Sequence, residues 1–373
     1  MNLISYCMNV HPGEDIASIR RAISDIAIPL RTAFEHGDEM PLGLRLSAHA
    51  AQELRVPEAL RSFNAFLQAN RLKVMGINGF PYGAFHGETV KEKVYSPDWS
   101  TVERQTYTHD LFYAATRLPM AYLGENRFSV STVPLGYDRE QGITDDYLEN
   151  ICDFALFLRK LEGFTGRRLC LALEPEPDCL LDSCQSVIDF FERLWLHPNW
   201  NSAYRDLVGI CFDTCHFAVG YEDPLCSLRH LVSSRIPIAR IQVSAALEYT
   251  PYATAEDLMP FVDAIYLHQT TRRENDASVT CYPDLTTTIL PDLIGSRGRI
   301  HYHVPLVWQG NSHIGSTRNA LTPAFWRYVR AGGWPLEIET YTYNILPNTV
   351  CRRTLSEMLF EDMCWVRNQL RQV

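Results

Sequence analysis

The sequence predicts a (β/α)₈ TIM barrel that carries insertions, and three observations lead to this fold class. Short apolar runs rich in β-branched residues alternate with longer segments of helical period, the pattern of βα units around a parallel sheet. Eight such runs occur, the number of strands that closes a barrel of this type. The chain has 373 residues, whereas such a barrel typically takes about 250, so the surplus must form insertions.

The expected strands and helices follow one another in a regular order. The strands cover residues 3–9, 42–47, 72–78, 128–133, 169–174, 208–213, 239–244 and 335–340. The helices with the plainest period cover residues 16–34, 145–161, 184–196 and 356–370. In the first of these, apolar side chains recur three or four positions apart from Ile16 to Leu30. Thr144 and Asp145 supply capping residues for the second.

Two stretches interrupt the alternation and are the expected insertions, one after the third strand and one between the seventh and eighth. They cover approximately residues 79–110, rich in Gly, Tyr and Pro, and residues 245–298. The second is expected to hold a hairpin of residues 265–273 and 278–282 around a Glu274-Asn275-Asp276 turn. A ninth apolar run, residues 299–305, follows it, and the pattern leaves open whether this run or 335–340 closes the barrel. Without a linker, repeat or low-complexity tract, residues 1–373 are expected to form a single domain.

Composition and charge exclude several classes of protein. The formal net charge of −10 argues against a nucleic-acid binder, which needs a basic stripe along the phosphate backbone. The first residues, MNLISYCMNVHPGED, lack the cationic start of a signal peptide, and no run of about 18 apolar residues exists to insert into a membrane. The eleven cysteines contain no C-x-x-C pair. We therefore expect a cytoplasmic protein with reduced thiols.

Polar groups of metal-binding type stand at or near the ends of five expected strands. In a parallel barrel the loops that follow the strands converge, and active sites form there. The groups are Glu174; Asp213, with His216 three residues later; Gln242; His301 and His303; and Glu337 and Glu339. Residues two apart on a strand share a face, so each of the last two pairs is expected to point the same way.

A divalent metal ion explains this set best. Glu174, Asp213 and Glu339 on one rim would repel one another, and at least one would have to stay protonated if no cation lay between them. Carboxylates suit Mg²⁺ or Mn²⁺, and added imidazoles shift the preference towards Mn²⁺, Co²⁺ or Zn²⁺. Taken singly, each residue has an ordinary structural explanation: a glutamate can cap a helix and a histidine can donate to a buried carbonyl. Asp213 is harder to explain so, because a charged group closing an apolar strand is rarely buried without a partner.

Other residues near the expected mouth could bind a substrate. These are His11, Asn78, His86, His268 and His301. The aromatic loop after residue 78 suits a lid over a ligand, although a packed surface loop is an equal alternative. Cys211 and Cys215 flank Asp213 but are expected to be small core residues. No hydrolase elbow, P-loop or dinucleotide fingerprint is present.

The ordered set of site residues resembles the xylose isomerase-like barrel superfamily of sugar isomerases, ketose 3-epimerases and endonuclease IV nucleases. FDTCHFAVG, which contains Asp213 and His216, is similar to the sixth-strand motif of the endonuclease IV branch. The phrases NGFPYGAFHG, VKEKVYSPDW, FDTCHFAV, QVSAAL, YLHQ, HYHVPL and EIETYTY together resemble a narrower family, the EboE-type metabolite-traffic proteins, from about residue 76 to 346. That resemblance implies a protein encoded beside other enzymes of a cluster that makes or moves a small metabolite.

The superfamily resemblance implies that Glu174, Asp213 and Glu339 are metal ligands. This chain departs from the pattern at the seventh strand, where Gln242 stands in place of the usual His or Asp. A neutral amide is a weaker ligand, so we expect either loose binding through Gln242 or completion of the shell by His303. The His301-x-His303 pair also resembles the second-metal pair of the superfamily, which leaves the number of metals open.

Three functions remain as hypotheses. The first is a metal-dependent isomerase or epimerase of a sugar- or cyclitol-like metabolite, with Glu174, Glu339 and His216 as catalytic groups and an enediolate-type intermediate. The second is a metal-dependent hydrolase or phosphodiesterase with two or more metals. The third is a non-catalytic metabolite-binding protein, associated with other enzymes of the same cluster. All three expect a small-molecule partner and neither nucleic acid nor membrane.

Overall fold

The computed structural model describes residues 2–373 except 88, 122–126, 275, 349 and 351–352. Eight parallel strands form the main sheet, in the order β1-β13-β7-β6-β5-β4-β3-β2. Their bounds are β1 Ile4–Tyr6, β2 Met40–Arg45, β3 Leu72–Asn78, β4 Phe128–Thr132, β5 Leu169–Leu173, β6 Val208–Asp213, β7 Ile238–Val243 and β13 Leu336–Ile338. Each overlaps an expected strand, and β3 and β6 have the expected bounds. The (β/α)₈ prediction is therefore confirmed.

The sheet curls until its two edge strands nearly meet. Cys7, just after β1, forms an isolated parallel bridge with Gly43 of β2. The Ser5 hydroxyl donates to the Pro41 carbonyl at 3.0 Å and accepts the Gly43 N–H at 2.8 Å. The strand β13 lies between β1 and β7. The eighth strand of the barrel is thus the segment expected at 335–340, which resolves the ambiguity with 299–305.

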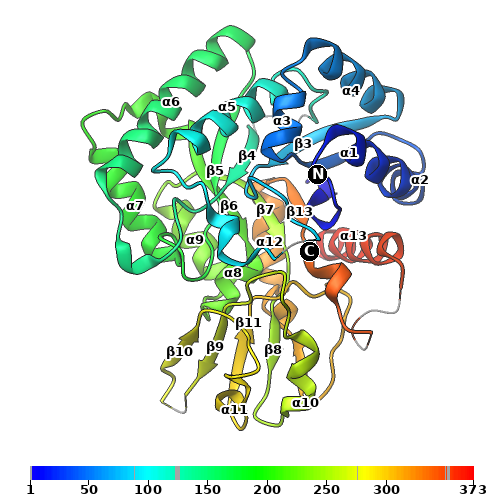
Figure 1. Ribbon diagram of the computed structural model, residues 1–373, viewed down its shortest axis with the longest axis vertical. Coiled ribbons are helices and arrows are strands. Elements are labelled where there is room, and N and C mark those ends of the chain that lie inside the picture. Colours follow the sequence, from blue (N-terminus) through cyan, green and yellow to red (C-terminus); the bar gives the residue numbers. More distant parts are fainter. Residues whose placement is uncertain (1, 88, 122–126, 275, 349, 351–352) are drawn as a thin grey trace.

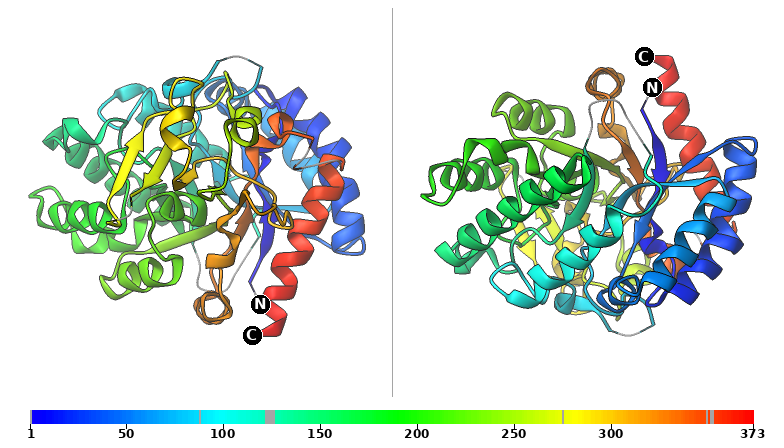
Figure 2. Two further views of the ribbon diagram at one scale, coloured as in Figure 1. Left: turned by 90° about the horizontal axis from the view of Figure 1, so that it is seen from below. Right: turned by 90° about the horizontal axis from the view of Figure 1, so that it is seen from above.

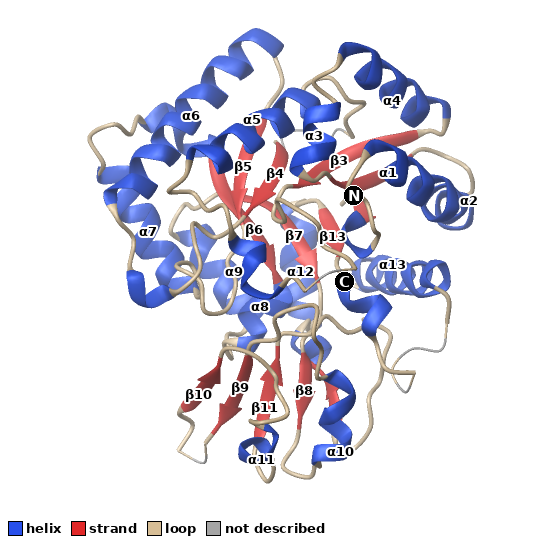
Figure 3. Cartoon of the chain, viewed as in Figure 1, coloured by secondary structure: helices blue, strands red, loops and turns tan. Residues whose placement is uncertain are grey.

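Helices surround these strands (Figure 3). They are α1 Ile16–Ala22, α2 Ile28–Phe34, α3 Ala48–Glu53, α4 Pro57–Ala69, α5 Val102–Ala115, α6 Asp145–Thr165, α7 Cys184–Leu196, α8 Thr214–Val219, α9 Pro224–Ser233, α12 Pro323–Gly332 and α13 Leu355–Gln372. The helix expected over 16–34 contains a π turn, Ile23–Ala27, between α1 and α2. Pro29 explains it, because proline has no N–H and its ring clashes with the carbonyl four residues back. The loop expected over 79–110 ends earlier, because α5 begins at Val102.

A second, antiparallel sheet lies between β7 and β13 in the sequence and across one end of the barrel in space (Figures 1 and 2). Its order is β10-β9-β11-β8-β12. The bounds are β8 Leu247–Tyr249, β9 Thr270–Arg273, β10 Val279–Tyr282, β11 Arg297–Ile300 and β12 Ile314–Ser316, with the short helices α10 Ala255–Leu258 and α11 Leu290–Leu293. The inserted segment thus reaches beyond residue 298.

The structure corrects two details of the expected insertion. The hairpin exists as β9 and β10, but residues 265–269 are not part of a strand, and Asn275 of the expected turn lies outside the described residues. The strand expected at 299–305 is wrong, because β11 ends at Ile300 after pairing antiparallel with β8 and β9. His301 and His303 therefore lie on a loop rather than on one face of a strand.

A buried ion pair crosses the barrel interior. Arg240 Nε lies 3.3 Å from Glu337 Oε2, and Arg240 Nη2 donates to Ser131 Oγ at 2.5 Å. Two glycines make room for it: a Cβ at Gly76 would lie 2.4 Å from Arg240 Nη1, and one at Gly43 would lie 1.9 Å from Glu337 Oε1. Glu337 is consequently engaged inside the barrel, while Glu339 lies beyond the strand end.

No helix among the described residues is both long enough and apolar enough to cross a bilayer.

Candidate metal centre at the barrel mouth

Three carboxylates meet at the carboxyl ends of the barrel strands. Glu174 directly follows β5, Asp213 ends β6 and Glu339 directly follows β13. One oxygen of each lies within 4.8 Å of one oxygen of the other two. All three side chains are buried, at 3%, 0% and 4% exposure respectively. Residues distant in sequence thus form one compact acidic cluster, as the strand-end argument predicts.

Asp213 is held by the helix that follows it. Its Oδ1 caps α8 by accepting the N–H groups of Cys215 at 2.7 Å and His216 at 3.1 Å. The same oxygen accepts the Ser244 hydroxyl at 2.6 Å. Its Oδ2 has no hydrogen-bond partner among the described residues. The side chain is therefore locked by one oxygen and presents the other.

Glu339 follows the same rule, and Glu174 likewise has one buried oxygen without a partner among the described residues. Glu339 Oε1 accepts from Asn9 Nδ2 at 2.5 Å, whereas its Oε2 and Glu174 Oε2 have no partner in the part of the chain that the structure describes. Three buried carboxylates this close together, each with an oxygen that lacks a partner, are costly unless a cation or protons compensate their charge. Hard carboxylate oxygens at this spacing fit a divalent metal ion.

Burial and mutual repulsion raise the pKa values of two of these carboxyl groups. Burial, with further contributions from Asp213 and Glu176, raises the pKa of Glu174 to about 8, although His216 opposes the shift. Burial also raises the pKa of Glu339 well above its usual value, helped by Glu174 and Asp213. Without a cation, the cluster therefore holds protons at neutral pH.

His216 faces this cluster. Its Nδ1 lies 2.8 Å from the Pro175 carbonyl, which can only accept, so Nδ1 carries the proton and Nε2 is left with a lone pair in the neutral ring. Nε2 lies 3.9 Å from Asp213 Oδ1. Burial lowers the pKa of His216, but Asp213, Glu176 and Glu174 together raise it further, so the net shift is upward.

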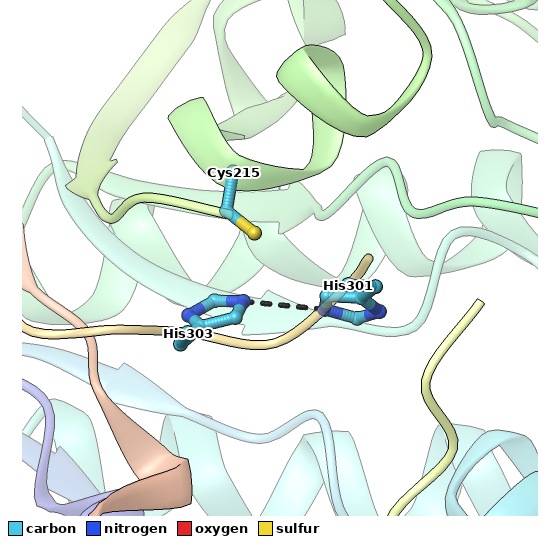
Figure 4. Close-up of side chains that lie close together, drawn as sticks. All are labelled: Cys215, His301 and His303. Atoms are coloured by element: carbon cyan, nitrogen blue, oxygen red, sulfur yellow. Dashed lines mark hydrogen bonds between the residues drawn. The ribbon is translucent and has the colours of Figure 1, made fainter. Parts of the chain in front are cut away.

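His301 and His303 face each other beside the cluster, and Cys215 from α8 lies over them (Figure 4). His301 Nδ1 lies 2.7 Å from Gln269 Oε1, and His303 Nδ1 lies 3.1 Å from the Glu339 carbonyl. Both acceptors need a proton from Nδ1, so in the neutral rings neither Nε2 atom carries a proton. The two Nε2 atoms lie 3.2 Å apart, and their lone pairs therefore face each other. Burial and the neighbouring histidines lower the pKa of His301 well below 6.5, and burial lowers that of His303 to about 4. A shared cation would resolve this contact.

The two residues that were expected to complete the metal shell, Gln242 and His303, have different surroundings. Gln242 Oε1 lies 3.1 Å from Cys211 Sγ, which donates to it. His303 offers a nitrogen within 4.8 Å of ligand atoms of both Asp213 and His216. His303 does not share such a group with Glu174 and Glu339 together among the clusters of the described residues. Cys215 joins His301 and His303 in a further group, but burial and Asp213 raise the pKa of its thiol well above the usual value.

The residues expected to bind substrate divide into two groups. Asn78 and His301 line the cavity at the barrel mouth, about 470 Å³ including the part open to solvent. His11, His86 and His268 are absent from that lining. His11 Nε2 bonds Tyr6 Oη at 3.1 Å, His86 lies 2.6 Å from both the Asn9 carbonyl and Tyr266 Oη, and His268 Nδ1 donates to the His301 carbonyl at 2.8 Å. These three rings hold loops together.

Several residues of the cavity were not anticipated. Glu176 accepts the Tyr95 hydroxyl at 2.7 Å and lies 3.6 Å from His301 Nδ1, and burial raises its pKa to about 7. The one local signal for Glu176 in the sequence was the Glu-Pro-Glu motif at residues 174–176. Asn9 and Tyr341 also line the cavity. They stand in loops whose convergence no local pattern reveals.

Comparisons with known proteins place the fold. No family model and no curated protein sequence matches the chain. The solved structures that resemble it are xylose isomerase-like TIM-barrel proteins, among them sugar epimerases and a dehydratase. The narrower EboE-type resemblance has no support from these comparisons.

Three of these structures illustrate the likeness. The probable 3-DHS dehydratase AsbF from Bacillus anthracis, involved in petrobactin synthesis, is 14% identical with a TM-score of 0.51, over 99% of each chain. A xylose isomerase-like TIM barrel protein from Mycobacterium smegmatis in complex with magnesium is 11% identical with a TM-score of 0.52, over 100% of this chain and 97% of that one. The IolI protein with a bound zinc atom is 14% identical with a TM-score of 0.51, over 100% and 99%. At this identity the likeness concerns the fold.

Proposed function

We propose that this protein is a metal-dependent isomerase or epimerase of a sugar- or cyclitol-like small metabolite, acting through an enediolate-type intermediate within a pathway that makes or moves a metabolite. The observation that carries the proposal is the cluster of Glu174, Asp213 and Glu339. Each has one buried oxygen without a partner among the described residues, and all lie within 4.8 Å at the mouth of the barrel.

A divalent cation would be held by these three carboxylates, with Gln242 or His303 as the further ligand predicted from the sequence. When bound, such a cation acts as a Lewis acid that polarises a carbonyl and orients the substrate. Proteins of this fold are described with magnesium and with zinc, and others are named as epimerases of L-ribulose and D-tagatose type. These neighbours support both the metal and the sugar-like substrate.

The protein's own residues supply the proton transfers. Glu174 follows β5 and Glu339 follows β13, and in the sheet these two strands are separated by β6 and β7. A carboxylate oxygen of each nevertheless lies within 4.8 Å of one of the other. One carboxylate can therefore take the proton α to a substrate carbonyl while the other returns it. His216, with its Nδ1 proton held by Pro175, directs Nε2 at a substrate oxygen. Tyr95 and Glu176, joined by a hydrogen bond of 2.7 Å, are further polar residues of the cavity lining.

Exchange of substrate hydrogen tests the proposal. A panel of ketoses, aldoses and inosose-type cyclitols is incubated in D₂O with the metal-loaded protein, and deuterium at the α carbon is followed by mass spectrometry. Wild type should incorporate deuterium into its substrate, and single Glu174→Gln and Glu339→Gln variants should lose at least about a hundred-fold in rate, the usual contribution of a general acid or base. Glu256→Gln, an exposed carboxylate on α10, is the matched control. Full exchange in both active-site variants would contradict the assignment.

The facing imidazoles favour a second candidate, a metal-dependent hydrolase or phosphodiesterase. Beside the carboxylate cluster, ligand atoms of Asp213, His216 and His303 form one further group and those of Glu176, His216 and His301 another. Hydrolases with two metals hold them about 3.5–4 Å apart. Metal analysis of the purified protein decides: two or more bound ions support this candidate, and a single ion contradicts it. Tight binding of a metabolite with neither exchange nor hydrolysis would instead indicate a non-catalytic binding protein.

A further inference from the structure

The cavity at the barrel mouth has two chemically different halves. Its floor is polar and contains the carboxylates of Glu174, Glu176 and Glu339 together with the neutral amides of Asn9 and Asn78. Asn78 Oδ1 accepts the Phe80 N–H at 3.1 Å, which fixes this amide in the lining of the cavity. Its roof is apolar and aromatic. The residues of the roof are Phe80, Phe85, Val90, Val94, Tyr266 and Tyr341.

Four of the six roof residues form a cluster separate from the hydrophobic core of the barrel, whereas Phe80 belongs to that core and Val94 packs against both. Phe85, Val90, Tyr266 and Tyr341 pack with one another rather than with the main core. The ring centroids of Phe85, Tyr266 and Tyr341 lie 5.1 to 5.4 Å apart in all three pairs. They come from the loop after β3, the inserted segment and the segment after β13. Three loops distant in sequence thus bring these rings together at the cavity.

The roof offers little to a purely hydroxylated ligand. Ligand pockets bind apolar groups on apolar walls and use a few polar groups to orient them. Tyr341 is 7% exposed, and its hydroxyl has no hydrogen-bond partner among the described residues. Of the two hydroxyls that the three rings carry, that of Tyr266 is already bonded to His86 Nδ1 at 2.6 Å. These rings therefore offer a free sugar few hydrogen-bond partners.

The charge of the cavity disfavours a phosphate. Lys91 is the one lysine or arginine among the described lining residues, and it is already paired: Nζ donates to Asp284 Oδ2 at 2.6 Å and to the Asp263 carbonyl at 2.8 Å. Below the floor, the Arg240 guanidinium is paired with Glu337. Apart from the proposed metal ion, a phosphate dianion would therefore meet carboxylates without a free lysine or arginine among the described lining residues, which costs affinity.

We infer that the ligand of this cavity is an unphosphorylated, hydroxylated compound that bears an apolar group. Its hydroxylated end lies on the floor with Asn9, Asn78 and the carboxylates, and its apolar group lies against Phe85, Tyr266 and Tyr341. This inference rests on the proposed function for the orientation of the hydroxylated end. The substrate class thus narrows from sugars in general to apolar ethers or glycosides of a sugar or cyclitol.

Competition among matched ligands tests the inference. Each pyranose and inositol of a small panel is prepared as the free polyol, the phenyl ether and the monophosphate at the same carbon. Binding to the manganese-loaded protein is measured by calorimetry. Each buried methylene is worth about a four-fold gain in affinity, so the phenyl ether of the best polyol should bind at least ten-fold more tightly than the free form. The monophosphate should bind more weakly than both.

Variants of one roof residue sharpen the test. Phe85→Ser should reduce the preference for the phenyl ether at least five-fold, whereas Phe85→Leu, which keeps an apolar side chain, should retain most of it. Thermal melting confirms that both variants are folded. Equal binding of the phenyl ether and the free polyol by wild type, tighter binding of the monophosphate, or no binding of any form at millimolar concentration overturns the inference.

The same panel separates this inference from the proposed function. Binding is measured without turnover, so a preference for the phenyl ether with no deuterium exchange supports the ligand class and contradicts the isomerase. Exchange on free polyols with no preference for the phenyl ether does the reverse.

Discussion

Replacing Glu174 by glutamine should stabilise the metal-free protein and abolish its stabilisation by divalent cations. Ionised carboxylates at most 4.8 Å apart repel by at least about 3.5 kcal/mol per pair at an effective dielectric constant of about 20. Glu174 faces Asp213 and Glu339, so full ionisation costs about 7 kcal/mol. Taking up a proton at pH 7 costs a carboxyl of ordinary pKa 4.5 only about 3 kcal/mol. Protonation therefore costs less than full ionisation of the cluster. The free energy of unfolding of the metal-free Glu174→Gln variant should thus exceed that of wild type by at most about 3 kcal/mol.

The expected signal is a melting temperature about 4 °C higher than wild type in EDTA at pH 7, since about 3 kcal/mol is spread over the unfolding entropy of 373 residues. Folding raises the pKa of Glu174 from 4.5 to about 8, so the folded state binds more protons and its stability falls as pH rises through this range. The gain of Glu174→Gln should therefore shrink towards pH 4.5. A cation at a hundred times its Kd should stabilise wild type by about 2.7 kcal/mol and leave the variant unchanged.

Scanning calorimetry of both proteins in EDTA between pH 4.5 and 8, and at pH 7 with Mg²⁺, Mn²⁺, Co²⁺ and Zn²⁺, measures all three effects. Glu256→Gln, which removes one exposed carboxylate, controls for net charge. A variant that is no more stable than wild type in EDTA, or that responds to cations as wild type does, would refute the reasoning.

Three further predictions concern stability. Glu337→Gln should lower the free energy of unfolding by about 3–5 kcal/mol in denaturant titrations, because it leaves Arg240 buried without a counter-charge. Gly43→Ala should destabilise the protein strongly, since its Cβ would lie 1.9 Å from a buried oxygen of Glu337, whereas Gly163→Ala on exposed α6 should stabilise by about 1 kcal/mol. Burial raises the pKa of Asp362 from 3.8 to about 7, so stability should fall as pH rises between these values, and Asp362→Asn should gain up to about 4 kcal/mol at pH 8.

Each of these has a clear contrary result. A Glu337→Gln variant as stable as wild type would mean that the ion pair contributes no net stability. Equal effects of alanine at Gly43 and Gly163 would contradict the close approach in the barrel wall. A pH profile of stability that Asp362→Asn does not alter would show that its carboxyl remains ionised when folded.

The barrel strands were predictable because their signal is local. Strands buried on both faces read as continuous apolar runs, and residues 72–78 and 208–213 show this within their own few positions. The strand expected at 299–305 failed for the opposite reason. Its pairing depends on β8 and β9, which come from elsewhere in the inserted segment, and pairing ends at Ile300.

The candidate site was partly predictable for a related reason. In a parallel barrel all strands point one way, so a carboxylate at a strand end must lie at the mouth, and Glu174, Asp213 and Glu339 meet there. Strand ends do not reveal which oxygen is already used. The bond from Cys211 to Gln242 and the hydrogen-bonded loop positions of His11, His86 and His268 appear only in three dimensions.

The sequence by itself determined the barrel, its direction and the three acidic strand ends, because apolar periodicity and strand polarity act over a few residues. Only the tertiary structure decided that β13 closes the barrel, that His301 and His303 oppose their lone pairs, and that Phe85, Tyr266 and Tyr341 form a roof. Those outcomes depend on loops that meet in space across more than two hundred residues of chain, as Phe85 and Tyr341 do. Such contacts are set by packing, which leaves no periodic trace in the chain.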